Sequence, residues 1–304
     1  MEGANLKGAQ NITQHIGTGS IRLELARGNL HLSDLAFTYP LKLVAPKASP
    51  KSQSVFLLSY GGGLVGGDAI ALSVVLEPNT TIALMTQGST KIFKKRPGLP
   101  ATQQTMEVEL QAGATCLLIP DPVQPFAGSA YTQRQSFTLH DESNLILLDW
   151  VVSGRPANGE IWDFLEFTST NSIYAHDANQ PSHATGRRLI SRDAQIMCFP
   201  ETKKQMSKYN CMATMLFVGP ATAGASRTLL TRFKHEERIR GHSGSRIHQS
   251  DPGMVQWTVT SHRTVTILKV VGESSEQVKE FLNATVDDVG WRSQYGREPF
   301  RALE

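Results

Sequence analysis

The chain has 304 residues, of which 40% are hydrophobic and 19% charged. This length and composition suffice for a packed core without disulfides or structural metals. Its formal net charge is only +3, with acidic and basic residues interspersed, which argues against a nucleic-acid partner. The three widely spaced cysteines indicate neither a disulfide framework nor a zinc site and fit a reducing, cytoplasmic location. We expect neither secretion nor membrane spanning, because residues 1–4 are not a basic region followed by an apolar stretch and no long apolar run occurs in the sequence.

The first two thirds of the chain are dominated by strand patterns. We expect residues 1–19 to form a flexible arm ahead of a single domain spanning the rest of 1–304, with a first strand near residues 20–25. From about residue 55 to residue 167, apolar residues alternate with polar ones, and Pro, Gly, Asn and Asp separate the runs. This period of two is typical of strands with one buried face.

Three segments of this region share one pattern: a strand ending in leucine, a short polar turn and a second strand. They span residues 74–87, 108–121 and 138–150. The pattern recurs about every thirty residues, which lies within the range of stacked β repeats. Stacking would bring equivalent strand ends to one side of the molecule. It would thereby gather the polar residues at the ends of the second strands, which are Gln87, Asp121 and Asp149. A β-meander with coincidentally similar loops would give the same pattern, and both interpretations stay open.

The C-terminal third changes character. Residues 171–193 are polar and are interpreted as a surface loop, whereas residues 225–240 have apolar positions at helical spacing. A strand pair is expected near 255–271. Ser274 and Gln277 form a capping-box pattern for a second helix. The fold class predicted is mainly β: a two-layered, β-helix-like stack of strands with two helices in the C-terminal third.

The segment YGGGLVGGD (60–68) resembles a phosphate-binding loop, but no Gly-Lys-Ser/Thr follows it and the next run is a strand rather than a helix. In GSTK (88–91) the lysine follows the hydroxyl, which is the wrong order. We therefore expect the glycines to shape turns and to allow close strand approach. They are Gly61, Gly62, Gly63, Gly66 and Gly67. Asp68, a carboxylate with few charged neighbours in sequence, is the functional candidate of this segment.

Metal and catalytic motifs are weak. Only His242 and His248 are close together among the nine histidines, and nothing nearby completes a ligand set. We predict no fixed metal site and no tightly bound cofactor. Scattered oxygen ligands favour weak, exchangeable binding of a divalent ion. These are Asp68, Thr86, Asp121, Asp149 and Glu160.

No hydrolase signature is present, and we predict that the chain is not an enzyme. The alternative is a carbohydrate-active β-solenoid enzyme with Asp121 and Glu160 as the carboxylate pair. Few aromatic residues accompany these carboxylates. In GRPANGE (154–160), an ion pair between Arg155 and Glu160 closing a turn explains the residues at least as well as catalysis.

Prolines stiffen the segment PDPVQPF (120–126). Because proline lacks a backbone donor, we expect it to end a sheet ladder and to present a rigid edge suited to a protein contact. The residues of this expected contact are Pro122, Val123, Pro125 and Phe126.

Six collinear motifs resemble the urease accessory protein D family (UreD, called UreH in some bacteria), and its fungal and plant branch more than the short bacterial one. They are YPLKL (39–43), GGGLVGGD (61–68), TQGSTKIF (86–93), PDPVQPFAGSAYTQ (120–133), SGRPANGEIW (153–162) and WRSQYGREP (291–299). They cover most of the chain.

The resemblance implies a non-enzymatic maturation factor in a hetero-oligomer. Members of the family bind apo-urease, recruit UreF and the GTPase UreG, and assist transient nickel(II) on its way to the urease centre through an internal tunnel. The family fold is a two-layered, helix-like stack of strands with helices near the C-terminus. A GTPase partner would supply the energy, which explains why this chain has no nucleotide motif.

Several residues match family motifs. Asp68 matches the aspartate of the Gly-Gly-Asp motif, for which a place on the nickel route has been proposed. The threonine-glutamine motif contains Thr86, Gln87 and Lys91, and the Gly-Arg/Gly-Glu motif contains Arg155, Gly159 and Glu160. The chain departs from the family in the basic insert 94–104 and in lacking a tryptophan close behind Arg301.

Overall fold

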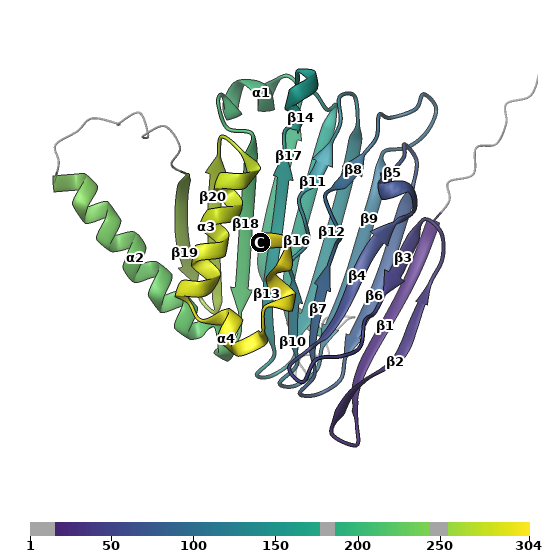
Figure 1. Ribbon diagram of the computed structural model, residues 1–304, viewed down its shortest axis with the longest axis vertical. Coiled ribbons are helices and arrows are strands. Elements are labelled where there is room, and N and C mark those ends of the chain that lie inside the picture. Colours follow the sequence, from purple (N-terminus) through teal and green to yellow (C-terminus); the bar gives the residue numbers. More distant parts are fainter. Residues whose placement is uncertain (1–15, 177–185, 243–254) are drawn as a thin grey trace, which may run out of the picture.

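The computed structural model describes residues 16–176, 186–242 and 255–304. Two large β-sheets face each other, and helices lie against the outer face of one of them (Figure 1). This architecture confirms the predicted mainly-β stack with two long helices in the C-terminal third.

The first sheet has the strand order β17-β16-β12-β9-β6-β1-β2. Its strands are β1 (Ile16–Ala26), β2 (Asn29–Phe37), β6 (Ala69–Leu76), β9 (Thr102–Leu110), β12 (Ala130–Leu139), β16 (Glu166–His176) and β17 (Arg187–Cys198). The second sheet has the order β19-β20-β18-β13-β10-β7-β4-β3. Its strands are β3 (Leu41–Val44), β4 (Gln53–Ser59), β7 (Thr81–Met85), β10 (Thr115–Leu118), β13 (Asn144–Val152), β18 (Cys211–Val218), β19 (Gln256–His262) and β20 (Val265–Gly272).

Short strands and helices complete the described residues. The short strands are β5 (Gly63–Leu64), β8 (Thr90–Ile92), β11 (Val123–Pro125), β14 (Gly154–Arg155) and β15 (Glu160–Ile161). The α-helices are α1 (Glu201–Met206), α2 (Ala223–His242), α3 (Ser275–Asp288) and α4 (Trp291–Tyr295). The 3-10 helices are η1 (Tyr60–Gly62), η2 (Pro156–Asn158), η3 (Pro220–Thr222) and η4 (Glu298–Leu303).

The chain alternates between the two sheets from β4 to β16, so each sheet receives successive parallel strands. In the register, Leu76 pairs with Leu110 and Leu110 with Leu139. These are the leucines that end the first strand of each repeated segment. The repeat therefore reflects stacked coils rather than a meander. The apolar alternation buries one face of every coil between the sheets, where leucine, valine and isoleucine dominate.

A short parallel ladder forms a third side of the coils. It joins β5 to β8, β8 to β11 and β11 to β13. Three of the six motifs supply these strands, one per coil: the glycine-rich segment, TQGSTKIF and PDPVQPF. The recurrence of such motifs at similar spacing thus follows from the stacking of equivalent corners.

The outer face of the second sheet is covered by α2, α3, α4 and η4 (Figure 1). A second apolar cluster fills this interface, with Leu229 of α2, Leu282 of α3 and Trp291 of α4 all at or below 1% exposure. The predicted cap of α3 is present, because the Ser274 hydroxyl accepts a hydrogen bond from the Gln277 amide at 3.3 Å. None of the described helices is both long and apolar enough to cross a membrane.

Two expectations require correction. The first strand begins at Ile16, four residues before the predicted position, so part of the expected arm is a strand. Residues 171–193 are not a loop: β16 and β17 occupy 171–176 and 187–193 and pair with each other over many residues. Their polar residues alternate between a buried and an exposed face. Residues 177–185 lie outside the described residues, as do residues 1–15 of the expected arm.

Candidate functional site

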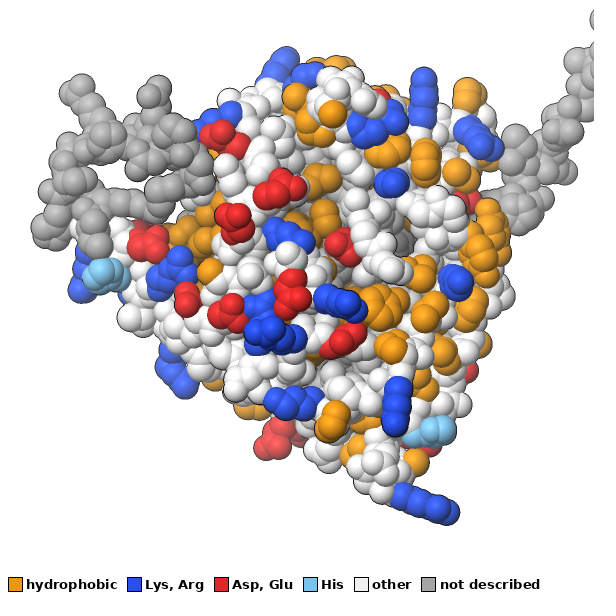
Figure 2. Space-filling view, viewed as in Figure 1, with side chains coloured by type: hydrophobic (Ala, Val, Ile, Leu, Met, Phe, Trp, Pro, Cys, Tyr) orange, Lys and Arg blue, Asp and Glu red, His pale blue; other side chains and the backbone are white. Residues whose placement is uncertain are grey.

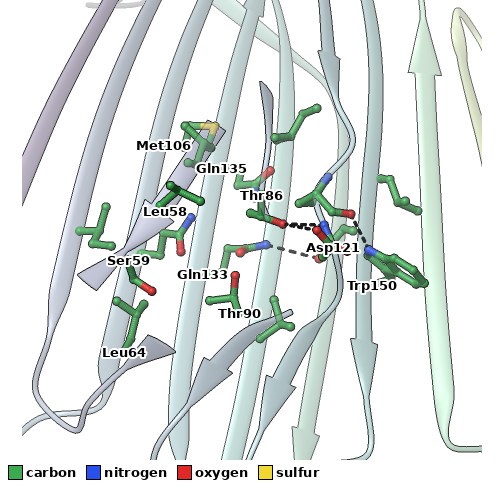
Figure 3. Close-up of a pocket in the computed structure, with 18 of the residues that line it drawn as sticks. Leu58, Ser59, Leu64, Thr86, Thr90, Met106, Asp121, Gln133, Gln135 and Trp150 are labelled. Atoms are coloured by element: carbon green, nitrogen blue, oxygen red, sulfur yellow. Dashed lines mark hydrogen bonds between the residues drawn. The ribbon is translucent and has the colours of Figure 1, made fainter. Parts of the chain in front are cut away.

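A cavity of about 60 Å³ lies between the two sheets near the middle of the stack (Figure 3). Apolar side chains of both sheets line much of it, and polar side chains converge on it from several successive coils. The polar lining residues are Ser59, Thr86, Thr90, Gln104, Asp121, Gln133, Gln135 and Asp149. Since the coils stack in register, residues about thirty positions apart meet at one place.

Asp149 is the buried carboxylate of this cavity, with 4% exposure. It lies on β13 and faces the first sheet, from which three side chains donate hydrogen bonds. Ser169 Oγ lies 2.6 Å and Asn171 Nδ2 lies 2.7 Å from Asp149 Oδ2, and Gln133 Nε2 lies 3.3 Å from Oδ1. The Tyr131 hydroxyl lies 3.0 Å from Gln133 Oε1 and orients that amide. The carboxylate thus ties the two sheets together.

Burial raises the pKa of the Asp149 carboxyl above its ordinary value, and the nearby Asp193 carboxylate raises it further. The hydrogen bonds from Ser169, Asn171 and Gln133 act in the opposite direction. The burial of Asp149 therefore favours the protonated carboxyl more than water does.

Polar residues continue from the cavity across the neighbouring strands. On the first sheet the register aligns Gln133 with Ser169 and Ser169 with Gln195. On the second sheet it aligns Asp149 with Thr214 and Thr214 with Lys269. We call this set the polar layer: Gln104, Gln133, Gln135, Ser169, Asn171, Asp193 and Gln195 on the first sheet, and Asp149, Thr214 and Lys269 on the second. It ends at an ion pair of 2.6 Å between Lys269 and Asp193.

Four buried oxygen atoms of the polar layer make no hydrogen bond to the protein. They are Gln135 Oε1, Asn171 Oδ1, Asp193 Oδ2 and Gln195 Oε1. All four are acceptors. Because an unpartnered buried acceptor is costly, such atoms call for water or a cation as a partner.

Thr86 and Asp121 form the wall of the cavity at its other end. The Thr86 hydroxyl donates to Asp121 Oδ2 at 3.1 Å and accepts from the Asp121 amide at 2.7 Å. The Gly88 amide also donates to Asp121 Oδ2. Figure 3 shows this pair between the strand ends, with the Trp150 indole directed away and donating to the Pro120 carbonyl. Neighbouring coils are therefore fastened together at this wall.

The structure brings Thr86, Asp121 and Asp149 to one cavity, and it locates the other candidates elsewhere. Gln87 is exposed and lines a groove on the outer surface next to Asp121. Asp68 is 9% exposed and accepts a hydrogen bond from the Val65 amide at 2.9 Å. It does not line the cavity. Asp68 therefore holds its own turn.

The glycines around Asp68 have the conformations that the turn requires. Gly61 has a φ of +76°, which strongly favours glycine. A Cβ on Gly63 would lie 2.6 Å from the carbonyl oxygen of Lys91 in the adjacent β8. Lys91 itself is exposed. The motif shapes a corner of the stack.

Arg155 and Glu160 form a two-pronged ion pair across β14 and β15. Arg155 Nε lies 2.8 Å from Glu160 Oε2, and Arg155 Nη2 bonds the other oxygen. Between them, Gly159 adopts a φ of +77°. The Arg155 hydrogen bonds lower the pKa of the Glu160 carboxyl, opposite to what a general acid needs. Glu160 does not line the cavity that Asp121 lines, so the two carboxylates do not share that site.

The prediction that residues 120–126 present an exposed, rigid edge is wrong. Val123 and Phe126 are each 8% exposed and Pro125 is buried, while Pro122 is half-buried. The reason is that β11 lies between β8 and β13 instead of ending a ladder. The Phe126 ring packs against Phe93 and under the Arg155 guanidinium. A partner contact through these side chains would require them to leave the core.

Within residues 16–176, 186–242 and 255–304, no three His, Cys, Asp or Glu side chains are grouped to hold a metal ion. The pair His242 and His248 falls largely outside this description: only the helical backbone of His242 is included. Burial raises the pKa of both Cys116 and Cys211 to about 12. These thiols therefore stay protonated and unreactive.

The partners of Asp149 were not foreseen from the sequence. Ser169 and Asn171 lie at the start of the segment interpreted as a loop or just before it, and Gln133 was noted only as the end of a motif. One signal was available: alternating polar residues on β16 and β17, with Asn171 and Asp193 at buried positions. A strand that places polar residues on its inward face indicates a polar interior.

A stacked β scaffold with a polar interior and no recognisable catalytic group among the described residues is the class of protein that fold and site define. The sequence model of the UreD urease accessory protein matches residues 16–302. A UreD-like urease accessory protein of Schizosaccharomyces pombe is 34% identical over 94% of this chain and 98% of its own length. Urease accessory protein D of Arabidopsis thaliana is 30% identical over 88% and 94%, and UreD of Sorangium cellulosum is 31% identical over 93% and 83%. The chain belongs to the UreD urease accessory protein family.

Proposed function

We propose that this chain is a non-catalytic scaffold for urease maturation in the cytoplasm. In this role it binds apo-urease, recruits UreF and the GTPase UreG, and lets nickel(II) pass through its interior as cargo. Family membership supports the maturation role. The observation that supports the nickel route is the polar layer, which contains a buried carboxylate and unpartnered oxygen acceptors between two otherwise apolar sheets.

The chemistry of the polar layer suits transit better than storage. Oxygen ligands bind nickel(II) less firmly than imidazole or thiolate ligands do. No histidine or cysteine belongs to the layer. The amide oxygens of Gln135, Asn171 and Gln195 are neutral, and Lys269 balances the charge of Asp193. An ion moving along these groups would keep part of its water shell and exchange quickly.

Co-purification tests the scaffold role. The tagged chain is expressed with the urease subunits, UreF and UreG of the same organism, and the complex is isolated and measured by native mass spectrometry. We expect a hetero-oligomer that contains apo-urease, and we expect no GTP hydrolysis by the purified chain alone. A chain that stays free of all these proteins would contradict the role.

Asp149→Asn tests the nickel route. The substitution removes the charge with little change of shape, so the complex should still assemble. We expect the rate of urease activation in the reconstituted system to fall about tenfold, corresponding to about 1.4 kcal/mol in the limiting step. Thr170→Ala, a change on the other face of β16 in the opposite sheet, is the control and should activate normally. Full activation by Asp149→Asn would exclude Asp149 from the route.

Asp68 requires a separate test, because its family motif and its position suggest different roles. Asn at position 68 keeps an oxygen for the Val65 amide but removes the charge, whereas Ala removes both. If Asp68 only holds the turn, Asp68→Asn activates urease like the natural protein and Asp68→Ala loses solubility or partners. If Asp68 contributes charge to the nickel route, both variants assemble and both activate slowly.

A further inference from the structure

A groove with a volume of about 690 Å³ lies on the outer face of the second sheet. It lies over β3, β4 and β7, on the side of η4 away from the long helices. Its floor and sides are lined by Lys42, Val44, Phe56, Leu58, Met85, Thr86, Gln87, Gly88, Asp121, Arg301 and Ala302. The cavity described above lies on the inner face of the same sheet.

The groove is the part of this sheet face that the helices leave uncovered. From β7 to β19 the outer face packs against α2, α3, α4 and η4. Over β3 this cover stops: Val44 is 40% exposed, whereas Phe56 of β4 is half-buried against the edge of the apolar cluster. Figure 2 shows orange side chains gathered on this side of the molecule, whereas the surface over the helices carries mixed charges. An apolar face that continues a covered one indicates a missing partner.

The charges at the groove define that partner. Lys42 is exposed, and Arg301 has a side-chain exposure of 68% and forms an ion pair with Glu298 at 3.8 Å. The single carboxylate of the lining, Asp121, accepts hydrogen bonds from Thr86 and Gly88. Lys42 and Arg301 outnumber Asp121 among the charged residues of the lining, so positive charge predominates there. An acidic segment with apolar side chains would match both the floor and the rim.

The exposed rings of Tyr39 and Tyr60 adjoin the ends of β3 and β4. Their centroids lie 5.5 Å apart, with exposures of 59% and 49%. Aromatic residues of this kind are enriched at the centres of protein interfaces. They extend the apolar surface beyond the groove and favour a protein over a small molecule as the occupant.

The groove and the cavity share three lining residues, namely Leu58, Thr86 and Asp121. The wall between them is thus one layer of side chains, fastened by the hydrogen bonds of the Thr86–Asp121 pair. A partner segment in the groove would lie directly across this wall from the space that Asp149 faces.

We propose that this groove docks an acidic, apolar segment of one of the urease-maturation partners and that the segment covers the Thr86–Asp121 wall of the interior cavity. The assignment rests on the proposed function, since it takes the partner from the maturation complex. It goes further by naming the surface, the chemistry of the segment and its position relative to the interior.

Photo-crosslinking in the reconstituted complex tests the occupant. A benzophenone amino acid replaces Val44 in the groove or, as a matched control, Leu25, which is 45% exposed on the first sheet. We expect position 44 to crosslink to an acidic segment of urease, UreF or UreG, as mapped by peptide mass spectrometry, and position 25 to give no such product. Crosslinking of position 44 to a second copy of this chain, or to nothing, would overturn the proposal.

Charge reversal tests the chemistry. Lys42→Glu combined with Arg301→Glu should weaken binding of the crosslinked partner about tenfold or more, and the effect should shrink at high salt. Lys204→Glu combined with Lys234→Glu, at exposed positions of α1 and α2, changes the net charge by the same amount and should bind normally. Circular dichroism and the melting temperature establish that each variant is folded.

The outcomes separate the two proposals. If the natural chain forms the complex and the double variant binds equally well, the groove assignment is wrong while the maturation role stands. If the natural chain forms no complex with any of these proteins, the maturation role itself fails.

Discussion

The space between the two sheets and the space beneath the helices are both buried, yet they are filled differently. Beneath the helices, aromatic and aliphatic side chains such as Trp291, Phe217 and Leu282 meet with few polar groups. Between the sheets, an apolar core is interrupted by the polar layer around Asp149. A protein that only needed stability would fill both spaces alike, because buried polar groups cost free energy unless fully paired. The difference supports the proposal that the interior of the stack carries the function while the helices contribute stability.

The largest expected effect lies beneath the helices. Trp291 is 1% exposed and packs against Phe217 and Phe300. Trp291→Ala should lower the free energy of unfolding by about 3–5 kcal/mol, because it leaves a cavity in a dense apolar cluster. Guanidinium denaturation measures this change. Leu165→Ala, at a position that is 54% exposed, is the control and should change stability by less than about 0.5 kcal/mol. Similar losses for both variants would remove the contrast.

Asn171→Ala tests the polar layer. It should lower the free energy of unfolding by roughly 1.5–3 kcal/mol, the range for a hydrogen bond to a charged group. Burial already raises the pKa of Asp149 in the folded protein. The protonated carboxyl therefore contributes its full stability at pH values below the ordinary pKa of an aspartate, and this contribution is lost as the pH rises through the pKa of the folded state. Removing the Asn171 donor raises the pKa of Asp149 further. The loss should therefore be greater at pH 7.5 than at pH 4.5.

Urea denaturation of the natural chain and the variant at both pH values measures this dependence. Asp193 and Lys269, the charged groups nearest to Asp149 in the polar layer, are unchanged in the comparison. Thr170→Ala provides the control, with no expected pH-dependent difference. An Asn171→Ala effect independent of pH would mean that the amide serves packing rather than the carboxylate.

Ser274→Ala sharpens the comparison at the edge of the helix layer. The hydroxyl caps α3 by accepting a hydrogen bond from the Gln277 amide. Its loss should lower the free energy of unfolding by about 1 kcal/mol. Ser274→Asp keeps an acceptor at this position and should retain most of the stability. Thermal unfolding of the three proteins side by side gives the order, and an Asp variant as weak as the Ala variant would argue against a capping role.

The smallest effect is expected at the rim of the stack, for Glu160→Gln. Arg155 lowers the pKa of Glu160, so this carboxylate stabilises the fold at pH values above the ordinary glutamate pKa of 4.5. The contribution is lost as the pH falls through the lower pKa of the folded state. The melting temperatures of the natural chain and the variant should converge in acid. The same variant tests the carbohydrate-enzyme alternative: polysaccharide turnover by the natural chain that disappears in Glu160→Gln would revive that alternative.

Much of the fold could be predicted because the stacked strands follow from local patterns of apolar alternation and turn residues. The leucines at 76, 110 and 139 and the turns behind them indicated coils that pair in register. The cap at Ser274 is similarly local. The segment 171–193 was misread because its polar composition resembles a loop, although it alternates as β16 and β17 do. Composition misleads where the covered face of a strand is itself polar.

The candidate site was predictable only in part. Gln87, Asp121 and Asp149 were expected to gather because they end equivalent strands. Asp121 and Asp149 do line one cavity, together with Thr86, whereas Gln87 lines the outer groove. Asp68 was the most conspicuous carboxylate in sequence, yet it caps its own turn. Val123 and Phe126 were expected at an edge and lie in the core. In each case the local pattern identified the strand or turn but not what packs against it.

The sequence by itself determined the coils, their period and the family, because alternation, turn chemistry and motif order are properties of neighbouring residues. Only the tertiary structure decided that Ser169 and Asn171 of one sheet converge on Asp149 of the other, and that the helices stop short of β3 and leave a groove. The physical reason is that a strand's own periodicity gives its two faces, whereas the partner of each face comes from segments far away in the chain.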